Sequence, residues 1–247
     1  MNIIRILLYK EFIIFKKSLL LYVSFLFLFP LILFLFFSIP LSLLFMDMKP
    51  IYTIWSSIGI CFVCSLFLTY LFHFSYLSRI YKKETTKSLP IWPYHYLFSG
   101  YIFSIIVGLV EFFIAVLVTS SMTSDIISIV SLIKLIVIIL PSIIIVCNLS
   151  FLIFKISDNF MAKNIFNILI FLILSLGFGS FIPLSYFPEN YNNIVQYLPI
   201  ASSIYNAQNI IVSKSFFFSL LFISFFYMVV FSLISYFVID NNFTNKN

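Results

Sequence analysis

Charged residues and glycine are both scarce in this chain of 247 residues. Charged residues make up 9% of the sequence, against about 25% in soluble domains. Because 63% of the residues are hydrophobic, no soluble core could hide them, and the composition excludes a water-soluble globular protein. Five glycines leave little room for a phosphate-binding loop, and no Gly-x-x-x-x-Gly-Lys-Ser/Thr sequence occurs.

Catalytic and metal-binding motifs are also missing. His73 and His95 have no histidine or carboxylate at ligand spacing, and no Gly-x-Ser-x-Gly sequence occurs. Cys61, Cys64 and Cys147 fall within apolar runs, where packing as small apolar side chains is favoured over a metal or redox pair. We therefore expect no enzyme, no metal site and no cofactor held by this chain itself.

Long apolar runs fill most of the sequence. Each has close to the ~20 apolar residues that a hydrocarbon core of ~30 Å needs, and none alternates in the manner of barrel strands. The sequence therefore predicts an all-α membrane protein in which residues 1–247 form a single transmembrane domain. The predicted spans are Leu19–Met46, Ile51–Ser78, Leu97–Met122, Leu135–Phe154, Ile165–Pro183 and Phe216–Ile239.

Basic residues predict how the chain is oriented. If the N-terminus is cytoplasmic, eleven of the 14 lysines and arginines lie in cytoplasmic segments, and three, Lys49, Lys134 and Lys214, lie outside. An even number of spans returns the C-terminus to the cytoplasm. We expect a multi-pass protein of the plasma membrane with both termini cytoplasmic. The net charge of +6 follows from this topology, so we expect no nucleic-acid partner.

Residues 1–18 predict an amphipathic helix before the first span. At about 100° per residue, polar and basic side chains gather on one side, while Ile3, Ile6, Leu7 and Ile14 face away. Such a helix is expected to lie in the membrane interface with its cations near anionic headgroups. The alternative is a plain basic extension of the first span. The residues on the polar side are Arg5, Tyr9, Lys10, Lys16 and Lys17.

Glu111 is the one acidic residue near the middle of a predicted span. An ionisable group there is costly in free energy and is a functional candidate. It would line a translocation path or take up a proton. The alternative is a structural role, as a neutral carboxyl bonded to a neighbouring helix or across a dimer interface.

Residues 79–96 form the main polar interruption, between the second and third predicted spans. The segment is too short for a domain but long enough for a small cytoplasmic helix to which a partner protein would bind. Apolar anchors ringed by charge are typical of interface hot spots. The alternative is a solvated loop whose lysines set the topology. The residues that we single out are Lys82, Lys83, Glu84, Lys87, Leu89, Ile91 and Trp92.

This segment resembles one in a known family. Ser88-Leu89-Pro90-Ile91, with Tyr101 at the matching distance, is similar to a Ser-Leu-Pro-Ile/Val step in permease subunits of type-2 ATP-binding-cassette (ABC) transporters. That step precedes a Lys-Tyr pair, and here Gly100 replaces the lysine. The charged residues that follow the step in the family are replaced by residues 92–96, Trp-Pro-Tyr-His-Tyr.

A second resemblance lies after the fifth predicted span, in residues 184–213. Permeases of this family carry a Phe-Pro pair, a short linker and a Leu-Pro-hydrophobic sequence there, and the resemblance implies outer re-entrant helices that cap the path. The matching residues are Pro183, Phe187, Pro188, Tyr191, Pro199 and Tyr205.

The resemblance implies a permease subunit of an ATP-driven exporter. Residues 79–96 would be its coupling helix, held by a cytoplasmic ATPase present in two copies that binds ATP and Mg. A second permease subunit, identical or paralogous, would complete the path in the lipid bilayer. The implied substrate is amphiphilic: a peptide, lipid-like molecule or drug, with weak similarity to exporters of peptide toxins or antimicrobial peptides in low-GC Gram-positive bacteria. Alternatives are polysaccharide export, an ion-coupled secondary transporter using Glu111, and a membrane component that transports nothing.

Overall fold

The computed structural model describes residues 3–17, 19–48, 51–82, 93–123, 127–156, 160–212 and 214–244. All regular structure within these ranges is helical. Five of the helices are long and apolar enough to cross a membrane, which confirms the prediction of an all-α, multi-pass membrane protein. These five candidate spans are Tyr22–Ser42, Tyr52–Ile80, His95–Thr123, Ile129–Ile156 and Phe218–Val238.

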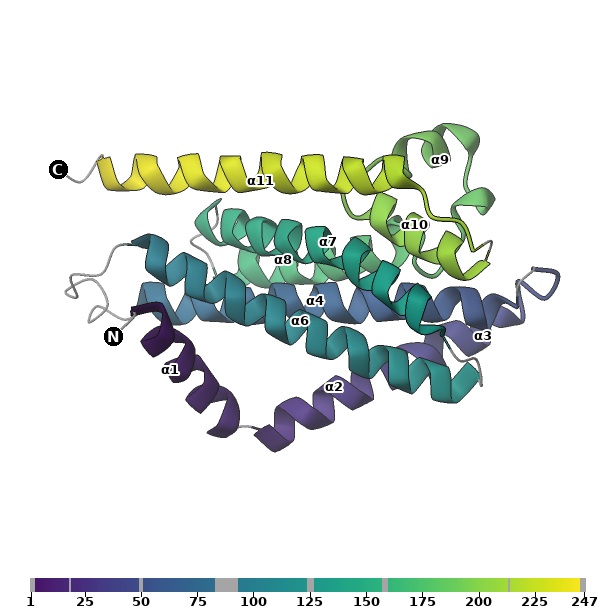
Figure 1. Cartoon of the computed structure of the whole chain (residues 1–247), viewed down its shortest axis with the longest axis horizontal. Coiled ribbons are helices and arrows are strands. Elements are labelled where there is room, and N and C mark those ends of the chain that lie inside the picture. The colour runs from purple at the N-terminus through teal and green to yellow at the C-terminus, as the bar shows by residue number, and fades with distance from the viewer. Residues whose placement is uncertain are drawn as a thin grey trace.

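The N-terminal part folds as two helices that meet at a sharp angle, α1 (Ile3–Lys17) and α2 (Leu19–Leu33) (Figure 1). A π-helical turn, η1 (Phe34–Ser38), continues α2 into the short α3 (Ile39–Ser42). In η1 the Ile39 N–H bonds to the carbonyl of Phe34, five residues back. The next residue, Pro40, has no N–H to donate, and a widened turn beside a proline is a common response.

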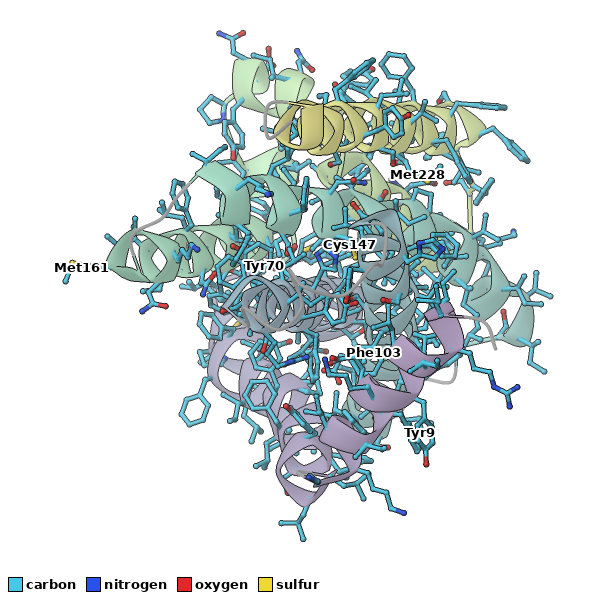
Figure 2. All side chains as sticks on the ribbon, turned by 90° about the vertical axis from the view of Figure 1, so that its left-hand side faces the viewer. Tyr9, Tyr70, Phe103, Cys147, Met161 and Met228 are labelled. Atoms are coloured by element: carbon cyan, nitrogen blue, oxygen red, sulfur yellow. The ribbon has the colours of Figure 1, made fainter. Side chains whose placement is uncertain are left out.

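Helix α4 (Tyr52–Lys82) forms the centre of the bundle. In its apolar window 83% of the residues are buried, against 17% in α11 (Phe218–Thr244) at the edge. Helices α6 (Pro93–Thr123) and α7 (Ile129–Ile156) pack against α4, and aliphatic and aromatic side chains fill the space between them. In the end-on view, Tyr70 of α4 and Cys147 of α7 lie near the middle, whereas Tyr9 of α1 points outward (Figure 2).

The predicted fifth span, Ile165–Pro183, is shorter than expected. Helix α8 (Phe160–Leu172) passes into a π-helical turn, η2 (Ile173–Gly177), and regular structure ends at Gly177. The apolar run Met161–Gly177 is below the length of the five candidate spans. At 1.5 Å per residue it covers about 25 Å, less than a hydrocarbon core of about 30 Å.

Three further boundaries differ from the predicted ones, because each helix continues into polar sequence. Helix α4 reaches Lys82 and α6 begins at Pro93, so both ends of the polar segment 79–96 belong to long helices. Helix α7 begins at Ile129 instead of Leu135, since the Oγ of Ser128 accepts the Ser131 N–H (3.2 Å) and caps the helix.

The described chain begins and ends on the same side of the bundle, which we call the terminal end (Figure 1). The opposite side, the cap end, carries three short helices: η3 (Leu184–Tyr186), α9 (Glu189–Val195) and α10 (Ala201–Val212). We call residues 178–212 the cap. These two ends hold most of the residues that the sequence singled out.

Candidate functional site

At the terminal end an ion pair joins α1 to the end of α4. The Arg79 guanidinium donates to the carboxylate of Glu11, which is 4% exposed, and also to the Oγ of Ser75 at 2.8 Å. Leu7, one turn before Glu11, is buried on the same side of α1. The N-terminal helix is therefore held to the bundle by this ion pair and by apolar contacts, among them that of the Phe15 ring with the Phe72 ring of α4.

The opposite side of α1 carries the residues predicted from its amphipathic pattern. The side chains of Arg5, Tyr9, Lys10, Lys16 and Lys17 are all exposed. Ile6 and Phe12 are exposed as well, at 48% and 58%, so α1 presents an apolar strip beside its cations. Such a combination suits a helix in the membrane interface.

The predicted coupling residues Lys83, Glu84, Lys87, Leu89, Ile91 and Trp92 lie outside the described residues, and Lys82 is the last residue of α4. What the structure describes is the base from which this segment leaves. There the Tyr76 hydroxyl of α4 donates to the carbonyl of Tyr96 in α6 at 2.7 Å. The Tyr76 ring packs directly against Gly100. A side chain there would collide with it, because a Cβ at that position would lie 2.6 Å from the Tyr76 Cε1. A lysine, the residue usual in the resembling family, would displace this ring.

Glu111 lies inside the bundle, between α6 and α4. Its side chain is 0% exposed, and neither carboxyl oxygen has a hydrogen-bond partner within the described part of the chain. The neighbouring Phe112 ring packs edge-on against the Phe62 ring of α4, with 6.0 Å between centroids. This part of α6 therefore contacts α4. A residue so enclosed cannot face a dimer surface. For the alternative of a hydrogen bond to a neighbouring helix, the described residues offer the Glu111 carboxyl no partner.

At the cap end the chain turns sharply after α8. Gly179 has a φ of +76°, and a Cβ there would lie 2.7 Å from the Leu184 Cγ. The backbone of the next residue touches α4 directly, since a Cβ on Gly59 would lie 2.0 Å from the carbonyl oxygen of Ser180. Two glycines therefore permit the turn and its docking against α4.

Hydrogen bonds hold the turn in place. The Tyr52 hydroxyl of α4 donates to the carbonyl of Phe181, whose ring is fully buried. From α10, the Gln208 side-chain amide donates to the carbonyl of Gly179 at 3.0 Å. The cap is thus tied to the bundle on one side and to its own last helix on the other.

Three of the residues predicted for the cap lie at its bends. Pro183 precedes η3, Pro188 precedes α9, and Pro199 lies in the turn before α10. The Tyr191 hydroxyl donates to the carbonyl of Gly177 at 2.7 Å, joining α9 to the end of η2. Phe187 and Tyr205 pack against a buried cluster of Leu184, Val195 and Ala201. All six predicted residues thus belong to one packed unit.

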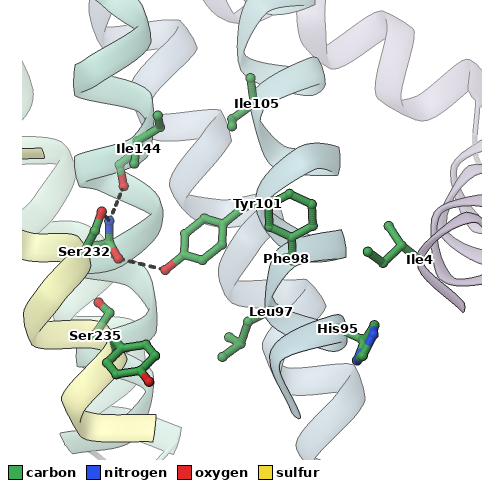
Figure 3. A pocket seen from close by; sticks show the side chains of 11 residues that line it. Ile4, His95, Leu97, Phe98, Tyr101, Ile105, Ile144, Ser232 and Ser235 are labelled. Carbon is green, nitrogen blue, oxygen red and sulfur yellow. Dashed lines mark hydrogen bonds between the residues drawn. The ribbon is translucent and has the colours of Figure 1, made fainter. Parts of the chain in front are cut away.

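A pocket of about 540 Å³ opens at the terminal end between α6, α7 and α11 (Figure 3). Its lining is mostly apolar, with contributions from Ile4 of α1 and from Leu97, Phe98 and Ile105 of α6. The lining contains no carboxylate, lysine or arginine among the described residues. A pocket of this size and character is typical of sites for small amphiphilic ligands.

A neutral polar network forms one wall of this pocket. The Tyr101 hydroxyl donates to the Asn148 side-chain carbonyl at 2.8 Å, and the Asn148 amide donates to the Oγ of Ser232 at 3.2 Å (Figure 3). Ser235, one turn further along α11, is 2% exposed and lines the same pocket. The network therefore links α6, α7 and α11, and it leaves hydroxyl groups next to an apolar cavity.

Sequence reasoning missed Glu11, the Tyr101–Asn148–Ser232 network and the close approach at Gly100. For Glu11 a signal was present, since it is the one acid among the basic residues of α1 and falls one turn after an apolar position. Within the described residues, no three His, Cys, Asp or Glu side chains are placed to hold a metal ion. A scan of protein-family models and a search of curated proteins find no match to this chain.

Proposed function

We propose that this chain is the membrane subunit of an ATP-driven exporter of the type-2 ABC kind. In this proposal two permease subunits form a path for an amphiphilic substrate, and a separate cytoplasmic ATPase supplies the energy. The chain itself performs no catalysis. The observation that carries the proposal is the cap, a set of short helices packed against α4 where the fifth span stops short.

The path of the chain supports six spans. Helix α8 and η2 carry the chain from the terminal end back to the cap end, so that both termini of the described chain lie on one side (Figure 1). In the proposed subunit this short segment is the fifth span, and the cap fills the remaining depth of the membrane. Irregular backbone at that depth is tolerated when protein covers it, as with the buried Phe181 and Leu184.

The contacts at the terminal end would transmit a movement of the ATPase to the membrane helices. The proposed coupling residues leave from the ends of α4 and α6, which Tyr76 joins by its hydrogen bond to Tyr96. One turn away, Arg79 connects α4 to α1 through Glu11. A displacement of residues 83–92 by the ATPase would therefore move α4 and α6, and α1 with them.

The pocket in Figure 3 supports an amphiphilic substrate. Its apolar walls suit a hydrophobic body, and the Tyr101–Asn148–Ser232 network offers neutral hydrogen-bonding groups. Its lack of described charged groups fits lipid-like molecules, hydrophobic drugs or apolar stretches of peptides better than small ions.

The test is to express the chain together with an ATPase, encoded by a neighbouring gene, that has a phosphate-binding loop and no spans. We expect the two to co-purify and to hydrolyse ATP. The double variant Leu89→Ala/Trp92→Ala is expected to lose the ATPase while the spans stay folded. A matched control is Leu19→Ala/Leu20→Ala, which removes two exposed apolar side chains at the start of α2.

Two results would refute the proposal. The first is retention of the ATPase by the Leu89→Ala/Trp92→Ala variant with full coupled activity. The second is transport by the chain alone in liposomes that contain no ATPase.

An ion-coupled secondary transporter is the second candidate, and Glu111 is the observation that favours it. A fully buried carboxyl with no described partner is the kind of group that carries a proton in such proteins. Transport by the purified chain driven by a pH gradient, and abolished in Glu111→Gln, would establish this candidate instead.

A further inference from the structure

A second pocket, of about 600 Å³, lies at the cap end. It is bounded by the start of α4, the end of α6, the start of α7 and the end of α10. In Figure 1 these four helix ends gather at the side opposite the termini. The pocket is therefore distinct from the one in Figure 3, which lies at the terminal end.

Two lysines converge on this second pocket. Lys134, in the second turn of α7, is half-buried, whereas Lys214, which follows α10 with a φ of 55°, is exposed. Neither ammonium lies within 4.0 Å of a carboxylate oxygen in the part of the chain that the structure describes. A half-buried ammonium is costly in free energy unless it has an anionic partner, so Lys134 favours an anion in the pocket, and the exposed Lys214 adds a second positive charge to the lining.

Hydroxyl groups add to the lining. Ser57, Ser120 and Thr123 come from α4 and α6, and Ser128 and Ser131 come from the start of α7. The last two bond to each other at 2.9 Å, and Ser128 already caps α7. Ser57 and Thr123 already donate to the carbonyls of Ile54 and Thr119. The lysines, rather than the helix end or the hydroxyls, therefore carry the argument for an anion.

Apolar side chains line the remainder of the pocket, among them Ile54, Ile58 and Ile211. A cationic rim above an apolar wall fits a ligand with an anionic head and a hydrocarbon chain. The pocket lies at the ends of helices of membrane-spanning length, which is where lipid headgroups are found.

We propose that this pocket binds one anionic phospholipid. The phosphate oxygens lie between Lys134 and Lys214, and an acyl chain runs along the isoleucines. This inference does not depend on the transport function, because it rests on the pocket alone.

The test uses the full chain in detergent, with phosphatidylglycerol or phosphatidylcholine added and bound lipid counted by native mass spectrometry. We expect one phosphatidylglycerol to be retained roughly tenfold more tightly than phosphatidylcholine. The double variant Lys134→Gln/Lys214→Gln is expected to lose this preference, and Lys134→Arg/Lys214→Arg to keep it. The control Lys155→Gln/Lys163→Gln removes the same charge at the terminal end and is expected to keep the preference.

Three results would overturn the proposal. One is an equal affinity of the wild-type chain for the two lipids. Another is a loss of preference in the control that matches the loss in Lys134→Gln/Lys214→Gln, which would indicate non-specific attraction. The third is full displacement of the lipid by equimolar inorganic phosphate, which would assign the pocket to a soluble anion.

Discussion

Glu11 and Arg79 form an ion pair between the N-terminal helix and the end of α4, across 68 residues of sequence. The Glu11 side chain is 4% exposed, whereas that of Arg79 is 31% exposed. Loss of either partner leaves the other without its main contact. This pair fixes the position of α1, which otherwise touches the bundle mainly through apolar side chains.

Glu11→Gln is expected to destabilise the chain by about 1–3 kcal/mol, because it leaves the Arg79 charge uncompensated. The double variant Glu11→Gln/Arg79→Gln is expected to recover part of that loss. Thermal unfolding in detergent measures both, with Lys10→Gln on the exposed side of α1 as the control. If the effects of Glu11→Gln and of Arg79→Gln alone add strictly in the double variant, the pair contributes no coupling energy.

Gly179→Ala is expected to loosen the cap. The φ of +76° costs an L-residue about 1–2 kcal/mol, and the new Cβ would collide with the Leu184 Cγ. Limited proteolysis within residues 184–199 should become faster, and the melting temperature should fall.

Gly177→Ala is the matched control for that variant. A Cβ at Gly177 would meet nothing closer than the Ile173 Cγ2 at 3.8 Å, so we expect the cap to keep its wild-type resistance. Equal behaviour of the two alanine variants would contradict the role assigned to Gly179.

Glu111→Gln tests what the buried carboxyl does. If its role is structural, the amide keeps the shape and removes an ionisable group from a dry site, so the melting temperature should be equal or higher. ATP-driven transport should continue. Loss of transport at normal membrane levels would instead assign Glu111 a direct part in translocation.

Gly100→Ala is expected to weaken the junction of α4 and α6 by about 1–3 kcal/mol, because the added methyl overlaps the Tyr76 ring. Gly100→Lys should be no better tolerated, although lysine is usual in the resembling family. Adding Tyr76→Leu to Gly100→Ala should restore part of the stability by making room. Unfolding temperatures of the three variants decide the matter, and a neutral Gly100→Ala would refute the close packing.

The spans were the predictable part of this fold, since hydropathy depends on local sequence alone. Leu19–Met46 and Leu97–Met122 lie within a few residues of the structural spans Tyr22–Ser42 and His95–Thr123. The break after Gly177 was not predicted, because residues 165–183 are mostly apolar and the sharp turn depends on Gly179, whose left-handed conformation is not evident from the sequence.

The side-chain contacts between helices were not predictable, for a different reason. Glu11 and Arg79, or Tyr101 and Asn148, meet through the three-dimensional packing of helices that are far apart in sequence. Lys134 was assigned to a loop by its charge, yet Ser128 starts α7 early enough to include it. Residue types indicated which groups matter, but their partners depend on how the helices pack.

The common side of the two chain ends has a consequence for gene architecture. Since the described chain starts and finishes on one face of the bundle (Figure 1), a second copy could follow the first after a linker that never enters lipid. A tandem duplication would then encode a two-fold symmetric pair on one polypeptide, with both copies inserted in the same direction.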